Sequence, residues 1–329
     1  MVHQYINNGY HIVLDVNSGA IHVVDEVVYD VIPLFEKHSS EEITGLLREK
    51  YSEEEIREAV EEVAQLKKEG SLFTPDTYEA PLIDFKKRPT VVKALCLHIA
   101  HDCNLACRYC FAEEGEYHGR RALMSYETGK AALDFLIANS GSRRNLEVDF
   151  FGGEPLMNFE VVKQLVAYGR EQEKLHDKHF RFTLTTNGVL LNDDIMEFAN
   201  REMDNVVLSI DGRKEVHDHM RPFRKGAGSY DLIVPKFQKF AKSRNQEKYY
   251  VRGTYTHFNT DFSKDVLHLA DLGFKQISVE PVVAEETDDY AIKEEDLPVL
   301  FKEYDDLAAE MVRRNKAGNG SVSYTHLRA

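Results

Sequence analysis

The sequence predicts an α/β fold for the larger part of the chain, preceded by a small α+β unit. From residue 93 onward, short runs of apolar and β-branched residues alternate with longer amphipathic stretches. That alternation is typical of repeated βα units around a parallel sheet. Before residue 75, hairpin-turn signals and helix-capping boxes indicate a few strands followed by helices.

The predicted first unit covers residues 1–75. Asn7-Asn8-Gly9 and Asn17-Ser18-Gly19 are its hairpin-turn signals. Strands are expected next to them, at 12–14 and 21–24. Asp25 is expected to cap a first helix, which Pro33 would kink or end. Capping boxes at 39–42 and 52–55 predict the starts of two further helices, and Gly70 is expected to end the last of them. We expect Leu72 and Phe73 to return to a strand, as a short wing.

Residues 76–90 are the predicted linker, and residues 91–317 the predicted larger domain. Its strands are expected at 93–99, 146–151, 180–185, 206–210, 249–257 and 276–280. Its helices are expected at 125–139, 158–175, 193–201, 229–243, 262–272 and 293–315. This order predicts a parallel sheet, either open or curled into a partial barrel, with sites at the carboxyl ends of the strands.

The motifs with reactive or polar side chains fall at those strand ends. In chain order they are Cys103, Cys107 and Cys110, then Gly152-Gly153-Glu154-Pro155, then Thr185-Thr186-Asn187-Gly188, then Ser209-Ile210-Asp211-Gly212. Taken alone, the second motif favours a simple strand-to-helix turn, and the last is only a turn signal. Their shared position predicts one site built from all of them.

The three clustered cysteines indicate a metal site rather than a disulfide framework. A structural zinc ion takes four protein ligands, and His98, His101 or His118 would supply the fourth. An iron–sulfur cluster normally takes four thiolates, so three would leave one iron open to a small molecule. The cluster is the favoured interpretation. The remaining cysteine, Cys96, lies in an apolar run and is expected to be a buried core thiol.

The composition limits the partners of the chain. A formal net charge of -15 argues against a nucleic-acid partner, because phosphate binding needs a basic face. No apolar run approaches the roughly 18 residues of a membrane span, and no signal peptide is recognisable. We therefore expect a cytoplasmic protein with no nucleic-acid or membrane partner.

The spacing C-x3-C-x2-C, with Tyr109 before the last cysteine, resembles the radical S-adenosylmethionine (SAM) superfamily. The resemblance implies a partial (β/α)6 TIM-like barrel and a 4Fe–4S cluster on the three cysteines, whose open iron binds SAM. Reductive cleavage of SAM then gives a 5′-deoxyadenosyl radical, which takes a hydrogen atom from the substrate. The implied SAM-binding residues are Gly152, Gly153, Glu154, Asn187, Ser209, Asp211 and Arg221. Glu154 would hold the amino group, Arg221 the carboxylate, and Ser209 with Asp211 the ribose.

Residues 9–19 and 22–30 resemble the maturases that form thioether crosslinks in SCIFF peptides (six cysteines in forty-five). That resemblance implies a winged-helix domain that binds the leader of a cysteine-rich precursor peptide as an added strand. It also implies a flavodoxin- or ferredoxin-like reductant. The family continues into a SPASM-type domain with auxiliary clusters, whereas no cysteine follows Cys110 here. Residues 318–329 are expected to be irregular, as a truncated or foreign tail.

Two other functions stay open at this point. One is a radical SAM maturase of another class, such as the anaerobic sulfatase type, which would share the core without the leader-binding unit. The other is a non-catalytic peptide-binding protein with a zinc or vestigial core.

Overall fold

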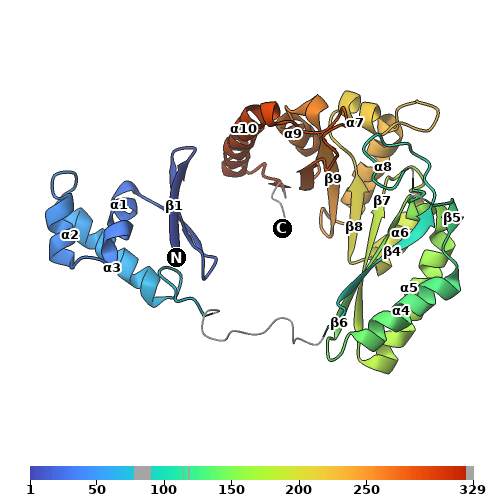
Figure 1. Ribbon diagram of the computed structural model, residues 1–329, viewed down its shortest axis with the longest axis horizontal. Coiled ribbons are helices and arrows are strands. Elements are labelled where there is room, and N and C mark those ends of the chain that lie inside the picture. The colour runs from blue at the N-terminus through green and yellow to red at the C-terminus, as the bar shows by residue number, and fades with distance from the viewer. Residues whose placement is uncertain (78–89, 114, 118, 324–329) are drawn as a thin grey trace. The chain divides into compact units, whose positions relative to one another are not determined.

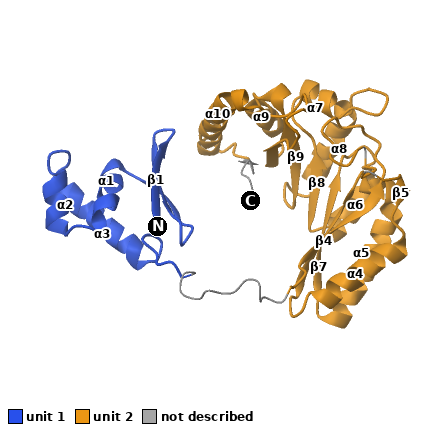
Figure 2. Cartoon of the chain, viewed as in Figure 1, with its two compact units in different colours: residues 1–88 blue, residues 89–329 orange. Residues whose placement is uncertain are grey.

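A computed structural model describes residues 1–77, 90–113, 115–117 and 119–323 of the chain. The chain divides into two compact units, Met1–Arg88 and Pro89–Ala329 (Figure 2). The predicted linker at 76–90 falls mostly on residues 78–89, which lie outside the described residues. No helix in the described part is both long enough and apolar enough to cross a membrane.

The first unit is a three-stranded antiparallel sheet followed by three helices. Its elements are β1 (Val2–Asn7), β2 (Tyr10–Asp15), β3 (Ile21–Val24), α1 (Glu26–Phe35), α2 (Ser40–Leu47) and α3 (Glu53–Lys68), with sheet order β1-β2-β3. Ser39 and Ser52 close the two predicted capping boxes at the starts of α2 and α3. Val13, Val31 and Ile56 are fully buried, so the sheet and helices share one core.

The predicted wing strand at residues 72–73 is wrong. Leu72 is buried in the core of the first unit at 1% exposure. Phe73 has a φ of 54°, in the left-handed region that an extended strand does not contain. The apolar pair therefore closes the core as irregular backbone. Pro33 behaves as predicted, because α1 ends at Phe35, within the same turn.

The second unit is built on an eight-stranded sheet in the order β11-β10-β9-β8-β7-β6-β4-β5. Its strands are β4 (Ala94–His101), β5 (Ala122–Leu123), β6 (Asn145–Gly152), β7 (His179–Thr186), β8 (Asn205–Ser209), β9 (Tyr249–Tyr255), β10 (Gln276–Pro281) and β11 (Val322–Ser323). All neighbouring pairs are parallel except β4 with β5. From β6 to β11 each strand lies beside the next in the chain, which is the winding of a partial barrel.

The helices of the second unit follow the strands in alternation (Figure 1). They are α4 (Tyr126–Asn139), η2 (Pro155–Asn158), α5 (Phe159–His176), α6 (Asp193–Glu202), α7 (Lys214–Met220), α8 (Tyr230–Ser243), η3 (His257–Asn259), α9 (Ser263–Asp271), η4 (Glu294–Asp296) and α10 (Leu297–Lys316). The six predicted strands and six predicted helices are all present. β5, α7 and the short 3-10 turns were not predicted.

The tail at 318–329 was expected to have no regular structure. Residues 322–323 instead form the short strand β11, which pairs in parallel with residues 276–277 of β10. Residues 324–329 lie outside the described residues.

The two faces of this sheet differ in character because side chains alternate along each strand. On β6, Leu146, Val148 and Phe150 are fully buried in the core that the helices cover. Asp149 and Phe151, between and after them, point to the opposite, concave face. Thr185 of β7 bonds Asp149 there at 3.2 Å, and Arg252 of β9 bonds Glu280 of β10 at 2.7 Å, so this inner side of the partial barrel carries polar and charged side chains.

Candidate active site

The three clustered cysteines lie on one loop at the carboxyl end of β4. The first of them is ordered by Asp102, whose carboxylate accepts a hydrogen bond from the Cys103 backbone N–H at 2.9 Å. The Cys103 sulfur in turn accepts from the Leu105 N–H and the Asn187 side chain, each at 3.5 Å. Two contacts to sulfur hold this thiol in place at the edge of the loop.

A second segment, the end of α7 and the residues after it, fixes the outer side of the cysteine loop. The N–H groups of Ala106 and Arg108 donate to the carbonyls of Pro222 and Met220, each at 2.9 Å. Arg224 donates to the Cys103 carbonyl at 2.9 Å and forms an ion pair with Asp102 at 2.8 Å. Segments more than 100 residues apart are thereby joined around the cysteines.

The three cysteine side chains open on one small cavity of about 140 Å³. The other described residues that line it are Leu105, Tyr109, Phe111, Ala112, Phe151, Gly152, Gly153, Thr185, Thr186, Asn187, Ser209 and Arg221. Among them there is no histidine and no fourth cysteine. The cavity therefore lies where the sequence predicted the site, at the carboxyl ends of β4, β6, β7 and β8.

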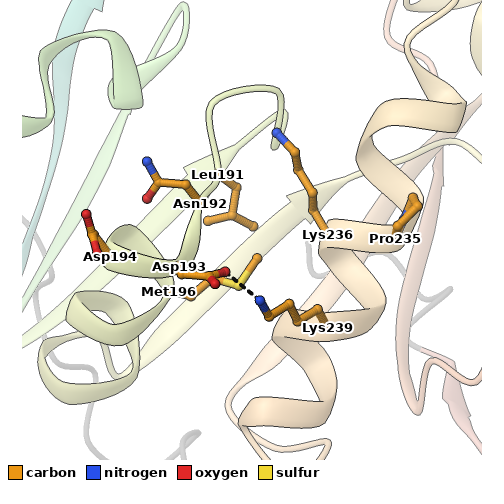
Figure 3. Close-up of a pocket in the computed structure, with 8 residues that line it drawn as sticks. All are labelled: Leu191, Asn192, Asp193, Asp194, Met196, Pro235, Lys236 and Lys239. Carbon is orange, nitrogen blue, oxygen red and sulfur yellow. Dashed lines mark hydrogen bonds and ion pairs between the residues drawn. The ribbon is translucent and has the colours of Figure 1, made fainter.

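A larger hollow, of about 630 Å³, lies elsewhere, between the start of α6 and the side of α8 (Figure 3). Lys236 and Lys239 extend toward it from α8, and Lys239 pairs with Asp193 at 2.6 Å. None of the predicted site residues lines this hollow. Its volume alone gives it no chemical function, and the smaller cavity is the candidate site.

The two glycines of the Gly-Gly-Glu-Pro motif let β6 approach the cysteine loop closely. A Cβ atom on Gly152 would lie 2.5 Å from the Ala100 carbonyl oxygen, and one on Gly153 would lie 2.1 Å from that of Asp102. The backbone is joined there by hydrogen bonds from Gly153 N–H to Ala100 at 2.7 Å and from Glu154 N–H to Asp102 at 2.8 Å. Only glycine fits this contact.

Glu154 is completely buried behind the cavity and does not line it. Its carboxylate accepts hydrogen bonds from the Thr186 hydroxyl at 2.7 Å, the Asn187 N–H at 2.8 Å and the Leu156 N–H at 3.0 Å. Burial raises its pKa to about 6, although these three donors act in the opposite direction. In this structure Glu154 joins the end of β6 to the end of β7.

Asp211, Tyr109 and Arg221 form a continuous hydrogen-bonded group. The Tyr109 hydroxyl lies 2.7 and 2.8 Å from the two carboxylate oxygens of Asp211, to which it donates. The same oxygen accepts from Nη1 of Arg221 at 2.9 Å. Asp211 is completely buried, and burial raises its pKa to about 6 while Arg221 opposes that shift. Sequence reasoning noted Tyr109 only as an aromatic residue and missed the role of its hydroxyl.

Most of the predicted site residues therefore meet at one place. Gly152, Gly153, Asn187, Ser209 and Arg221 line the cavity with the cysteines, whereas Glu154 and Asp211 lie beneath its surface and contact lining residues. Two polar residues at the site were not predicted: Asn104, which bonds Asn187, and Arg224, which bonds the Cys103 carbonyl. Thr186 belongs to a predicted strand-end motif, but its hydrogen bond to Glu154 was not predicted.

The histidines considered as zinc ligands do not join the cysteines in the described part of the chain. The rings of His98 and His101 lie 4.2 and 4.9 Å from the ring of Tyr117, and His118 lies outside the described residues. Among the described residues, no three side chains of the metal-binding types converge on one point. A single zinc ion needs such convergence, whereas each thiolate of a cubane cluster binds a different iron.

The prediction that Cys96 is a buried core thiol is wrong. Its side chain is exposed, because position 96 of β4 belongs to the concave face while Leu97 and Ile99 face the helices. The parallel register places Cys96 directly beside Asp149 of β6. An apolar sequence run did not reveal which face each residue takes.

The residues present fit a cluster and a carboxylate-bearing ligand. Burial raises the pKa of the Cys103 thiol to about 12 and of the Cys107 thiol to about 11, so iron binding would displace their protons. The Nε atom of Arg221 is buried and has no hydrogen-bond partner among the described residues. A buried guanidinium donor without a partner suits an anionic ligand in this cavity.

Comparison with known proteins gives a family match over the same region. The family model described as "Radical SAM superfamily" matches residues 97–272, more than half of the chain. An uncharacterized protein of Methanocaldococcus jannaschii is 31% identical over 189 residues, which are 57% of this chain and 62% of that protein.

Two solved structures share the fold. Native anSMEcpe with bound AdoMet and Kp18Cys peptide has a TM-score of 0.61 at 19% identity, over 70% of this chain and 63% of that one. Streptococcus suis SuiB bound to precursor peptide SuiA has a TM-score of 0.51 at 17% identity, over 95% of this chain and 69% of that one. The chain thus spans less than two thirds of the M. jannaschii protein and of anSMEcpe.

Proposed function

The chain belongs to the radical SAM superfamily, whose members use a 4Fe–4S cluster and SAM, and from that premise we propose that it is a peptide-modifying radical SAM enzyme. The observation that carries the proposal is the cavity itself. Three thiols and two glycines that admit close approach open on one cavity at the strand ends, together with Arg221, whose Nε has no partner among the described residues.

Each residue has a proposed part in holding the cofactors. Cys103, Cys107 and Cys110 would ligate three irons, which leaves the fourth for SAM. When bound, the cluster and SAM supply a 5′-deoxyadenosyl radical that abstracts a hydrogen atom from the substrate. Arg221 would pair with the SAM carboxylate, and Ser209 would bind a ribose hydroxyl from the cavity wall.

The remaining predicted residues would act at or just behind the cavity surface. Gly152 and Gly153 leave their backbone groups next to the cavity, where a ligand can approach them without meeting a side chain. Glu154 and Asp211 are already bonded inside the protein, to Thr186 and Tyr109 among others. We infer that their main part is to hold the ends of β7 and β9 and the neighbouring loops in place. Each carboxylate would contact SAM only through an oxygen lone pair that its internal hydrogen bonds leave unused. Asn187 would orient the Cys103 sulfur.

A peptide substrate is supported by the first unit and by the structural relatives. Strand β3 pairs only with β2 among the described strands, and Ile21 and Val23 on it are 67 and 65% exposed. A strand edge beside exposed apolar side chains is suited to the addition of a peptide strand. anSMEcpe and SuiB are both described in complex with peptides.

The finer proposal is a thioether crosslink in a cysteine-rich SCIFF-type precursor peptide, whose leader the first unit would bind. A flavodoxin- or ferredoxin-like protein would supply the electron. The alternative is a reaction of the sulfatase-maturase type, favoured by a 28% identity over 137 residues to a cysteine-type anaerobic sulfatase-maturating enzyme of Clostridium novyi. Deleting residues 1–75 separates the two, because only the first requires that unit for peptide binding.

The proposal is tested by anaerobic reconstitution with iron and sulfide. The protein is expected to take up a 4Fe–4S cluster and to form 5′-deoxyadenosine from SAM under strong reductant. Cys107→Ala should lose the cluster, and the matched control Cys96→Ala should keep it, because Cys96 lies outside the cavity. A protein that binds zinc and no iron, or that is loaded and forms no 5′-deoxyadenosine, would contradict the proposal.

A further inference from the structure

The hydroxyl of Tyr109 links the buried carboxylate of Asp211 to the guanidinium of Arg221, beside the cysteines. It donates to both carboxylate oxygens of Asp211 and accepts from Nη1 of Arg221. Among the described residues, no carboxylate lies within ion-pair distance of Arg221, and no other side-chain hydrogen bond from its guanidinium is present. The phenol thus stands between the Arg221 guanidinium and the Asp211 carboxylate.

This arrangement leaves the remaining donors of Arg221 to a ligand. A direct bidentate pair with Asp211 would occupy the guanidinium on the protein side. With the phenol inserted, one nitrogen is held and Nε stays buried without a partner in the described part of the chain. The guanidinium carbon also lies 6.0 Å from the centre of the Tyr109 ring. Ring and hydroxyl together restrict a side chain that otherwise has many rotamers.

The backbone around Arg221 is fixed separately from its side chain. Its N–H donates to the His217 carbonyl at 2.7 Å, and its carbonyl accepts from the Ser229 hydroxyl at 2.8 Å. His217 is completely buried and lies 2.9 Å from the same Ser229 hydroxyl. Loss of the Tyr109 hydroxyl would therefore release the guanidinium without moving the backbone that carries it.

We propose that Tyr109 is a positioning residue for SAM: its hydroxyl holds the Arg221 guanidinium in the orientation that binds the SAM carboxylate. This inference rests on the proposed function, since it takes SAM as the ligand of the cavity. It assigns to the hydroxyl a task that the aromatic ring alone cannot perform. Tyr109 lies between two cluster cysteines in the sequence, so the same residue couples the cluster loop to the SAM-binding arginine.

The test is a double-mutant cycle on SAM affinity, measured by equilibrium binding to the anaerobically loaded protein. Tyr109→Phe keeps the ring and removes the hydroxyl. We expect iron content and the electron paramagnetic resonance signal of the reduced cluster without SAM to stay unchanged. The dissociation constant for SAM should rise about tenfold or more, as for one lost hydrogen bond to a charged group.

The cycle distinguishes a positioning role from a general structural one. Because the phenol acts through Arg221, Tyr109→Phe should weaken SAM binding little further once Arg221→Ala is present. Tyr249→Phe is the matched control, because the Tyr249 hydroxyl accepts from the Lys275 N–H at 3.1 Å, at the opposite end of the sheet. That variant should bind SAM as the unmodified protein does.

Three results would overturn the inference. They are an unchanged SAM affinity in Tyr109→Phe, losses that add fully in the double variant, and loss of the cluster from Tyr109→Phe, which would place the hydroxyl's role in the cluster. If the unmodified protein itself binds no SAM, the proposed function fails instead, so the two failures are distinguishable.

Discussion

Gly153→Ala is the substitution with the most direct structural consequence at the site. The added Cβ would lie 2.1 Å from the Asp102 carbonyl oxygen, whereas real Cβ contacts essentially never fall below 3.0 Å. A gap of 0.9 Å must therefore open between the end of β6 and the start of the cysteine loop. Neither side yields as a flexible side chain would, because the nearest atoms are backbone atoms of Asp102 and Gly115.

The loss in folding free energy follows from the overpacking and from the hydrogen bonds that this movement breaks. Overpacking of a filled site costs about 1–3 kcal/mol. The two hydrogen bonds across the contact, from Gly153 to Ala100 and from Glu154 to Asp102, contribute about 0.5–1.5 kcal/mol each. A loss of about 2–6 kcal/mol would lower the melting temperature of a unit of this size by roughly 5–20 °C. Cys103, the first of the three clustered cysteines, follows Asp102 directly and would be displaced with it.

The assay is the iron content after anaerobic reconstitution, read beside a thermal melt. Gly153→Ala should melt lower and take up much less iron than the unmodified protein. Gly45→Ala is the control, because a Cβ there meets no atom within 4 Å and its φ is not positive. Full iron uptake by Gly153→Ala at an unchanged melting temperature would refute the argument that β6 and the cysteine loop are in rigid contact.

Three further predictions follow from side chains near the cavity. Glu154→Gln should destabilise the protein by about 1–3 kcal/mol in a denaturant titration. The reason is that both carboxylate oxygens accept buried hydrogen bonds, and the substitution replaces one of these oxygens with an amide NH2 group, which donates. Equal stability would contradict this prediction. Burial raises the pKa of Asp149 to about 6, so the folded chain holds a proton there that the unfolded chain releases near pH 4. The stability of the unmodified protein relative to Asp149→Asn should therefore fall by about 1–3 kcal/mol between pH 4 and 6, and a difference independent of pH would contradict this shift. In the cluster-loaded protein one thiol, that of exposed Cys96, should react with an alkylating reagent. Removal of the iron by a chelator should make three more thiols reactive. Cys96→Ser should abolish the reaction of the loaded protein.

The order of strands and helices could be predicted from the sequence wherever the hydrophobic periodicity was strong. The alternation of strands and amphipathic helices predicted the parallel order, and the motifs at strand ends predicted that Cys103, Gly152, Asn187 and Ser209 meet at one edge. This works because parallel strands share a direction, so their carboxyl ends converge whatever the exact curvature of the sheet.

What the sequence could not supply is which face a residue takes and which side chain lies between two others. Cys96 was assigned to the core because its neighbours are apolar, yet the strand alternation turns it to the concave face. Glu154 and Asp211 were expected at the ligand, and the structure buries both behind the cavity wall. The phenol of Tyr109 between Asp211 and Arg221 depends on a contact across more than 100 residues, which no local pattern encodes.

The central claim is that the protein supplies three thiolates to its cluster and leaves one iron for SAM. Mössbauer spectroscopy of protein reconstituted with iron-57, recorded with and without SAM, tests it most directly. We predict a 4Fe–4S cluster in which SAM changes the signal of one iron and leaves the others as they were. A spectrum that SAM does not alter, from a protein shown to be fully loaded, would contradict the account.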